Sequence, residues 1–129
     1  MKKKGLNFIK KGNFGEEIAK NFLIKNNYII CRMNYYCRYG EIDIIAENRS
    51  YLCFVEVKTR SSFNFALPVE FVNYRKREKL IKTAVDFLNS NPSLLQPRFD
   101  VIEVLILNYI KNKVELRHIK NAFYKESFY

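Results

Sequence analysis

The chain has 129 residues, of which 48% are hydrophobic, and it includes eleven phenylalanines and nine tyrosines. This length and composition predict one folded domain and exclude both a disordered tail and a two-domain protein. The net charge of +10 favours polyanionic partners, nucleic acid first and acidic membrane surfaces second, although structural RNA-binding proteins have the same excess of positive charge.

The cysteines and the N-terminal segment indicate the compartment. Cys31, Cys37 and Cys53 are odd in number and lack a paired C-x-x-C arrangement, so a zinc site is not expected. Free thiols fit a reducing compartment. The basic N-terminal segment has no apolar h-region, and no stretch approaches the length needed to cross a bilayer. We therefore expect a cytoplasmic protein that does not insert into membranes.

The N-terminal region combines a basic arm with a helix. Residues 1–11 contain five lysines and are expected to form a flexible arm ahead of a single domain at residues 12–129. Apolar residues at a spacing of four predict a helix from about Asn13 to Asn26. Glu16 lies at the border of its apolar stripe, where a carboxylate could reach a neighbouring site. The same residue fits a capping box that begins at Asn13, so both roles stay open.

Three strands are predicted after this helix: residues 28–36, 41–46 and 51–59. A polar tetrapeptide between the second and the third supplies a turn. The alternation of the second strand places Ile42 and Ile44 on one face and its acidic residues on the other. The second and third strands therefore form a hairpin, around which the rest of the chain is organised.

This hairpin carries three charged side chains, Asp43, Glu56 and Lys58, that are expected to share one face. A loop of Arg49-Ser50 places Asp43 directly opposite Glu56, and the other two- or four-residue loops keep the shared face. Two opposed carboxylates beside an apolar run repel each other, and a divalent cation held by their oxygens would remove that repulsion. A simple ion pair between Glu56 and Lys58 is the structural alternative.

The same residues resemble a known family. Asp43 and, after twelve intervening residues, Glu56-Val57-Lys58 have the form of the Asp…Glu-x-Lys motif of restriction-endonuclease-like nucleases. The phrases GEIDII at residues 40–45 and FVEVKTR at residues 54–60 resemble the YraN family, also called uncharacterised protein family 0102. That family is described as endonuclease-like and similar in fold to archaeal Holliday-junction resolvases.

The resemblance spans roughly residues 12–101. It implies an α/β fold, namely a restriction-endonuclease-like three-layer sandwich in which helices flank a mixed central sheet, and the predicted order of elements agrees with it. The activity implied is that of an endonuclease dependent on Mg²⁺ or Mn²⁺. In this interpretation Asp43 and Glu56 bind the metal, Glu16 assists from the helix, and Lys58 orients a water or stabilises the charge on the phosphate.

The second half of the chain adds a helix from about Asn73 to Asn89 and strands at residues 99–107 and 114–119. Five of the eight positions 75–82 are basic, which favours phosphate contacts over a solvated face. The family carries a basic position in this part of the helix, which Lys76 matches best. The residues expected to bind nucleic acid are Arg60, Arg75, Lys76, Lys79 and Lys82.

Two further polar residues are given structural roles. Asp100 enters the strand at residues 99–107 and is expected to anchor Arg98 rather than to support the metal. His118, the only histidine, is expected at the surface or at a sheet edge. Neither residue is therefore included in the candidate site.

DNA is the expected partner, and nothing in the sequence suggests base-specific readout. The similarity to junction resolvases implies branched DNA, and it also implies a homodimer, because such substrates have two-fold symmetry. Two alternatives stay open. One is a non-catalytic nucleic-acid-binding module, and the other is an adaptor that recruits a DNA-processing partner through the loop around Phe63 and Phe65.

Overall fold

The structure is a computed structural model that describes residues 11–61 and 74–123. Residues 1–10 of the predicted arm and the loop around Phe63 and Phe65 lie outside the described residues. The order of the described elements is the predicted one. Their bounds are α2 Lys11–Lys25, β1 Ile29–Cys37, β2 Gly40–Glu47, β3 Tyr51–Ser61, α3 Tyr74–Ser90, β4 Gln96–Asn108 and β5 Lys113–Phe123. Neither α2 nor α3 is long and apolar enough to cross a bilayer.

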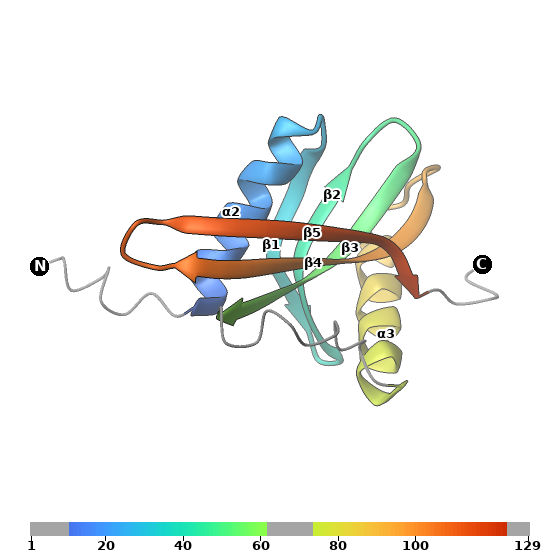
Figure 1. The fold of residues 1–129 in the computed structure, drawn as a ribbon. Coiled ribbons are helices and arrows are strands. Elements are labelled where there is room, and N and C mark those ends of the chain that lie inside the picture. Colours follow the sequence, from blue (N-terminus) through green and yellow to red (C-terminus); the bar gives the residue numbers. More distant parts are fainter. Residues whose placement is uncertain (1–10, 62–73, 124–129) are drawn as a thin grey trace, which may run out of the picture.

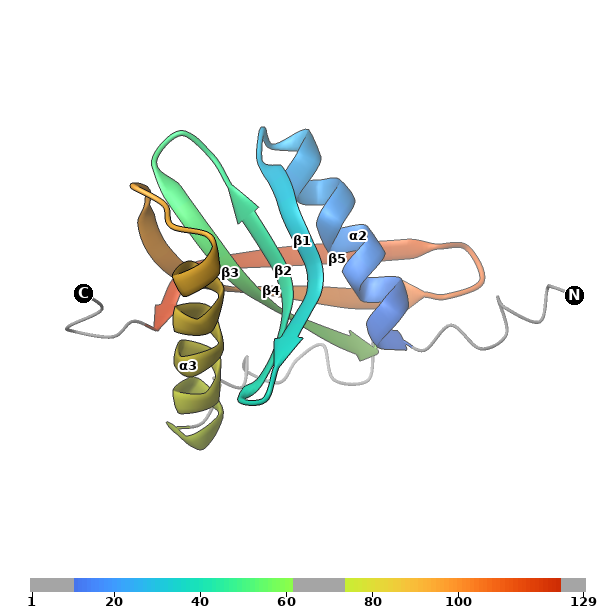
Figure 2. The same cartoon turned by 180° about the vertical axis from the view of Figure 1, so that it is seen from behind.

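The five strands form one mixed sheet in the order β1-β2-β3-β4-β5. β3 and β4 run parallel, and every other neighbouring pair is antiparallel. α3 lies in the crossover between β3 and β4, because two parallel strands cannot be joined by a tight turn. The sheet is strongly twisted, so that in Figure 1 the long β4–β5 ribbon lies across the direction of β1 and β2, and Figure 2 shows the same arrangement from behind.

Each face of the sheet has its own apolar core. Phe54 of β3 packs with Leu80 and Phe87 of α3. The next residue of the strand, Val55, packs with Leu23 of α2. Because successive strand residues point to opposite faces, α2 and α3 cover opposite sides of the sheet. The expectation of an α/β protein with a mixed sheet between helices is thus confirmed.

The β2–β3 hairpin has the register expected for the two-residue loop Arg49-Ser50. Its pairing includes Ile44 with Val55. At the tip, the Asn48 amide donates to the Tyr51 carbonyl at 3.0 Å, and the Asn48 side chain accepts from the Tyr51 amide at 2.8 Å. Asparagine favours such turns because its side chain can replace a backbone acceptor. The loop is therefore Arg49-Ser50, the case in which Asp43 lies opposite Glu56.

The regular alternation of β2 is interrupted around Asp43. Ile42 and Ile45 both pack in the core on the α3 side, whereas Ile44 packs in the core on the α2 side. The expectation that Ile42 and Ile44 share a face is therefore wrong. The ladder between β2 and β3 also ends at Ile44 and Val55. The two strands separate at this point, and the separation gives the neighbouring carboxylates room.

Candidate active site

A cleft of about 390 Å³ opens between the separated ends of β2 and β3 and the first turns of α3. Asp43 and Glu56 both line this cleft, so the two carboxylates that the sequence predicts to face each other share one space. Three cations of α3 line the same space. Among residues 11–61 and 74–123, the lining consists of Gly40, Glu41, Asp43, Glu56, Arg75, Lys76, Lys79 and Leu80.

Asp43 lies one residue beyond the end of the ladder. Its Oδ2 accepts a hydrogen bond from the Val57 amide at 2.8 Å, so the side chain takes the place of a backbone acceptor. Burial, followed by the charge of Glu56, raises the pKa of the Asp43 carboxyl to about 7. The charges of Glu16 and Glu41 act in the same direction, and the Val57 hydrogen bond acts against them. Asp43 therefore sits among carboxylates that repel its charge.

Glu56 obtains a counter-ion from α3. Its Oε2 lies 2.8 Å from the Nζ of Lys76, whose side chain is half exposed. Burial lowers the pKa of the Lys76 ammonium, but the hydrogen bond to Glu56 and the charge of Glu56 outweigh that effect, and the net pKa is raised. The structural alternative expected an ion pair with Lys58, whereas the structure shows Lys76 in that position.

α2 brings Glu16 near Asp43 without placing it in the cleft. A Cβ atom on Gly15 would lie 2.0 Å from the Thr59 Oγ1, so α2 approaches β3 more closely than a side chain at this position would allow. Glu16 accepts a hydrogen bond from the Asn34 side chain at 3.0 Å. α2 begins at Lys11, so Asn13 lies inside the helix. A capping box requires the capping residue to precede the first helical residue, and Asn13 does not meet that requirement.

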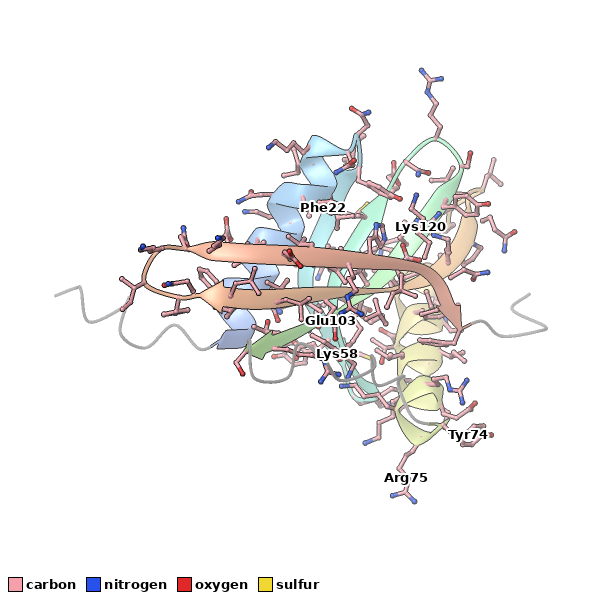
Figure 3. The ribbon with its side chains drawn as sticks, in the orientation of Figure 1. Phe22, Lys58, Tyr74, Arg75, Glu103 and Lys120 are labelled. Carbon is pink, nitrogen blue, oxygen red and sulfur yellow. The ribbon has the colours of Figure 1, made fainter. Side chains whose placement is uncertain are left out.

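Lys58 and Arg60 continue along β3 but do not line the cleft. Lys58 is paired in register with Glu103 of β4, and Figure 3 shows the two residues next to each other. Arg60 forms an ion pair with the same Glu103, whose side chain is 1% exposed, and the Arg117 Nε lies 3.5 Å from it. Arg60 is therefore held against the sheet by a buried carboxylate.

The basic row predicted on the second helix borders the carboxylates. Arg75 and Lys79 line the cleft together with Lys76. Figure 3 shows Arg75 projecting from the first turn of α3. Lys82 lies about one turn beyond this group and is exposed. Four of the five expected nucleic-acid contacts are thus on α3, and three of them face the space that Asp43 and Glu56 share.

The donor set fits Mg²⁺ or Mn²⁺ in its chemistry. Across residues 11–61 and 74–123, no three His, Cys, Asp or Glu side chains converge closely enough to enclose an ion. Mg²⁺, however, is usually held by one or two carboxylates together with waters and substrate phosphates, and Asp43 and Glu56 offer two such groups. Burial and then repulsion by Glu56 raise the pKa of Asp43, and a divalent cation would relieve the repulsion.

A separate buried cluster surrounds Asp100 on the α2 side of the sheet. Arg98 donates two hydrogen bonds to its carboxylate, at 2.9 and 2.8 Å, so the expected anchoring of Arg98 is confirmed. The His118 Nε2 lies 2.8 Å from the same group. His118 lies on β5, an edge strand, so the expectation of a surface or edge position is confirmed for the edge, although its side chain is only 8% exposed.

Two features near the site were missed in the sequence. Glu103 lies within ten consecutive buried residues of β4, and an acid inside such a run signals a buried partner. Thr59 opposes Gly15 across the contact between α2 and β3. No local pattern identifies that contact, because the two residues are far apart in the chain.

The comparisons with known proteins identify the family to which the chain belongs. The model of Uncharacterised protein family UPF0102 matches residues 15–104. A UPF0102 protein of Clostridium acetobutylicum is 47% identical over 116 residues, which cover 88% of this chain and 93% of that protein. One of Caldanaerobacter subterraneus subsp. tengcongensis is 47% identical over 114 residues, with 87% and 93% covered. One of Clostridium botulinum strain 657 is 42% identical, with 87% and 92% covered. The chain belongs to uncharacterised protein family UPF0102.

Proposed function

We propose that the protein is a metal-dependent endonuclease that hydrolyses phosphodiester bonds in DNA. The observation that carries the proposal is the shared cleft, where Asp43 and Glu56 meet Arg75 and Lys79. Oxygen ligands for a metal and cations for phosphates thus face one space. The three-layer arrangement of α2, the mixed sheet and α3 supports the restriction-endonuclease-like fold that the motif implies.

In this proposal the carboxylates of Asp43 and Glu56 hold Mg²⁺ or Mn²⁺, and Glu16 assists from α2. The bound ion would supply Lewis-acid polarisation of the phosphodiester and lower the pKa of a bound water. Lys58, on the same side of β3 as Glu56, orients that water or stabilises the negative charge that develops on the phosphate.

The cations of α3 bind the DNA backbone next to the scissile bond. Arg75 and Lys79 lie at the cleft, and Lys82 extends the row along the helix. Lys76 pairs with Glu56, and its ammonium would contact a phosphate instead if a metal took the Glu56 carboxylate. Arg60 acts indirectly, because its ion pair with Glu103 fixes the strand that carries Lys58.

The proposed substrate is branched DNA, and the proposed active form is a homodimer. Both follow from the likeness of the motif to junction resolvases. A four-way junction has two-fold symmetry, so two copies of one active site can cut it symmetrically. Phosphate contacts alone do not read base sequence, which agrees with recognition of DNA shape.

Cleavage of labelled four-way junctions, single strands and duplexes, with Mg²⁺, with Mn²⁺ or with a chelator, tests the proposal. We expect cleavage that requires metal. Asp43→Asn and Glu56→Gln should each lower the rate by about a hundredfold or more, because the metal supplies several kcal/mol. Glu115→Gln, on an exposed position of β5, is the matched control. If no substrate is cut, or if both variants cut at the normal rate, the proposal is wrong.

A second candidate is a nucleic-acid-binding module without catalysis. The ion pair between Lys76 and Glu56 favours it, since this pair neutralises Glu56 without a metal. Such a module would bind DNA in a salt-dependent way, and neither added metal nor Glu56→Gln would change its affinity. The adaptor alternative depends on Phe63 and Phe65, which lie outside the described residues.

A further inference from the structure

The turn between β4 and β5 presents two apolar side chains to solvent. Ile110 is 95% exposed and Tyr109 is 53% exposed. Figures 1 and 2 show that this end of the β4–β5 hairpin extends past β1, β2 and β3. We call residues 109–113 the hairpin tip. Ile110 lies at the end of this hairpin, where a large partner can contact it.

The hairpin tip is held in one shape by its own hydrogen bonds. The Asn108 side chain accepts from the Lys111 amide at 3.0 Å, and the Asn112 amide donates to the Tyr109 carbonyl at 3.2 Å. Asn112 has a φ of 58°, in the left-handed region that asparagine tolerates. Because the backbone is ordered in advance, a partner that contacts Ile110 loses little free energy in fixing it.

The hairpin tip also packs against α2, the helix that carries Glu16. The ring centroid of Tyr109 lies 5.2 Å from that of Phe14, with an angle of 60° between the rings. Phe14 directly precedes Gly15 and Glu16, the residues at which α2 approaches β3. A molecule that touches the hairpin tip is therefore near the first turn of α2.

The charges at the hairpin tip favour a polyanion. Lys111 and Lys113 are exposed on either side of the turn residue Asn112, and Glu115 is the first acid that follows along β5. Two apolar side chains are too few to hold a protein on a bilayer, because interfacial binding scales with the apolar area buried. One aliphatic side chain is enough to unstack a base step when cations hold the neighbouring phosphates.

We propose that the hairpin tip is a wedge, in which Ile110 inserts beside unpaired or unstacked bases while Lys111 and Lys113 contact the flanking phosphates. The inference rests on the proposed function for the identity of the ligand, DNA, and deepens it by naming the DNA feature that is recognised. A wedge selects bulges and branch points, since bases there are already partly unstacked and less free energy is needed to separate them.

Binding measured by fluorescence anisotropy in the presence of a chelator tests the wedge. The probes are a fluorescein-labelled duplex with a bulge and the same duplex without it. Ile110→Ser should weaken binding to the bulged duplex about tenfold and binding to the perfect duplex less than about twofold, because only the bulged duplex offers partly unstacked bases for the side chain to contact. Ile24→Ser is the matched control, since Ile24 lies on α2 and is 51% exposed, and it should change neither affinity.

A 2-aminopurine placed beside the bulge gives an independent readout. Its fluorescence should rise when the wild-type protein binds, because the base loses its stacking partner, and the rise should be absent with Ile110→Ser at saturation. Thermal melts of both variants should match the wild type, since each replaced side chain is exposed and makes few contacts.

Several outcomes overturn the wedge: equal affinities of Ile110→Ser and wild type for the bulged duplex, an equal loss for both duplexes, or binding to anionic vesicles that depends on Ile110. The chelator separates this test from the nuclease test. A protein that cleaves DNA but shows no Ile110-dependent preference for the bulged duplex overturns the wedge alone. If the protein shows an Ile110-dependent bulge preference but cleaves no substrate, only the proposal of nuclease activity is wrong.

Discussion

Asp43 and Asp100 are two aspartates in neighbouring parts of the same sheet, and their surroundings differ. Asp100 accepts hydrogen bonds from Arg98 and from the Asn121 amide and contacts His118. Asp43 accepts a hydrogen bond from the Val57 amide, and the carboxylates of Glu56, Glu16 and Glu41 lie close enough for their charges to act on it. The first carboxylate is surrounded by donors, and the second lines an open cleft.

The difference appears in the pKa values of the two carboxyls. Burial alone would raise the pKa of Asp100, but the hydrogen bonds from His118 and Arg98 outweigh it, and the pKa is lowered. Burial and then the charge of Glu56 raise the pKa of Asp43 to about 7. A buried aspartate is thus structural where donors satisfy it, and it is a candidate functional group where like charges surround it.

Asp100→Asn should give the largest loss of stability, because it leaves the Arg98 guanidinium buried without a carboxylate. Breaking such a pair costs about 3–5 kcal/mol, measurable as a fall in the free energy of unfolding in urea. Glu115→Gln, an exposed acid on β5, serves as the control with no expected loss. If Asp100→Asn lowers the free energy of unfolding by less than about 1 kcal/mol, Asp100 does not have the structural role that distinguishes it from Asp43.

Gly15→Ala should destabilise by about 1–3 kcal/mol, because the added Cβ would meet the Thr59 Oγ1 at 2.0 Å. The sign is diagnostic, since the same change inside a helix without such a contact stabilises by about 0.5–1 kcal/mol. Adding Thr59→Ala to Gly15→Ala should restore part of the lost free energy of unfolding, measured by urea unfolding. A double variant no more stable than Gly15→Ala would show that this contact does not position α2.

Asp43→Asn should increase stability at pH 8 by about 1 kcal/mol or more, since each unit of raised pKa corresponds to 1.36 kcal/mol and exposure to the cleft reduces the full effect. The asparagine can still accept from the Val57 amide, but it adds no charge beside Glu56. Cleavage should be lost in the same protein. A variant that is both inactive and less stable would indicate that Asp43 holds the fold together.

The pH dependence follows from the same pKa. Between the ordinary value of 3.8 and about 7, the folded protein keeps the Asp43 proton that the unfolded chain loses. Stability from this group is therefore fully present below about pH 4 and is lost as the pH rises through 7. The gain of Asp43→Asn should be absent at pH 4 and present at pH 8. An equal gain at both values would assign the effect to a cause other than charge.

Lys76→Met should give the smallest effect on stability, less than about 1 kcal/mol, because the Lys76 side chain is half exposed and solvent screens its pair with Glu56. Mn²⁺ binding, followed by calorimetry without DNA, should become tighter, since the ammonium no longer competes for Glu56. Lys82→Met, on the exposed side of α3, is the control. Weaker Mn²⁺ binding by Lys76→Met would contradict this role.

Much of the candidate site could be predicted from local pattern. The turn at residues 49–50 predicted the register that places Asp43 across from Glu56, although the alternation of β2 is interrupted at Asp43. The cluster of lysines and arginines at the start of α3 predicted the cations that share their cleft. Local pattern did not identify the ion-pair partners that lie far apart in the sequence. Arg60 pairs with Glu103 of β4, and Lys76, not Lys58, pairs with Glu56.

The sequence by itself determined the order of helices and strands and the family, because periodicity and short motifs are local properties of the chain. Tertiary structure decided which charges meet. The parallel alignment of β3 with β4 placed Glu103 beside Lys58, and the packing of α3 on β2 turned Lys76 toward Glu56. These contacts join residues that are far apart in sequence, and their energies depend on burial and distance, which exist only once the sheet and its helices have assembled.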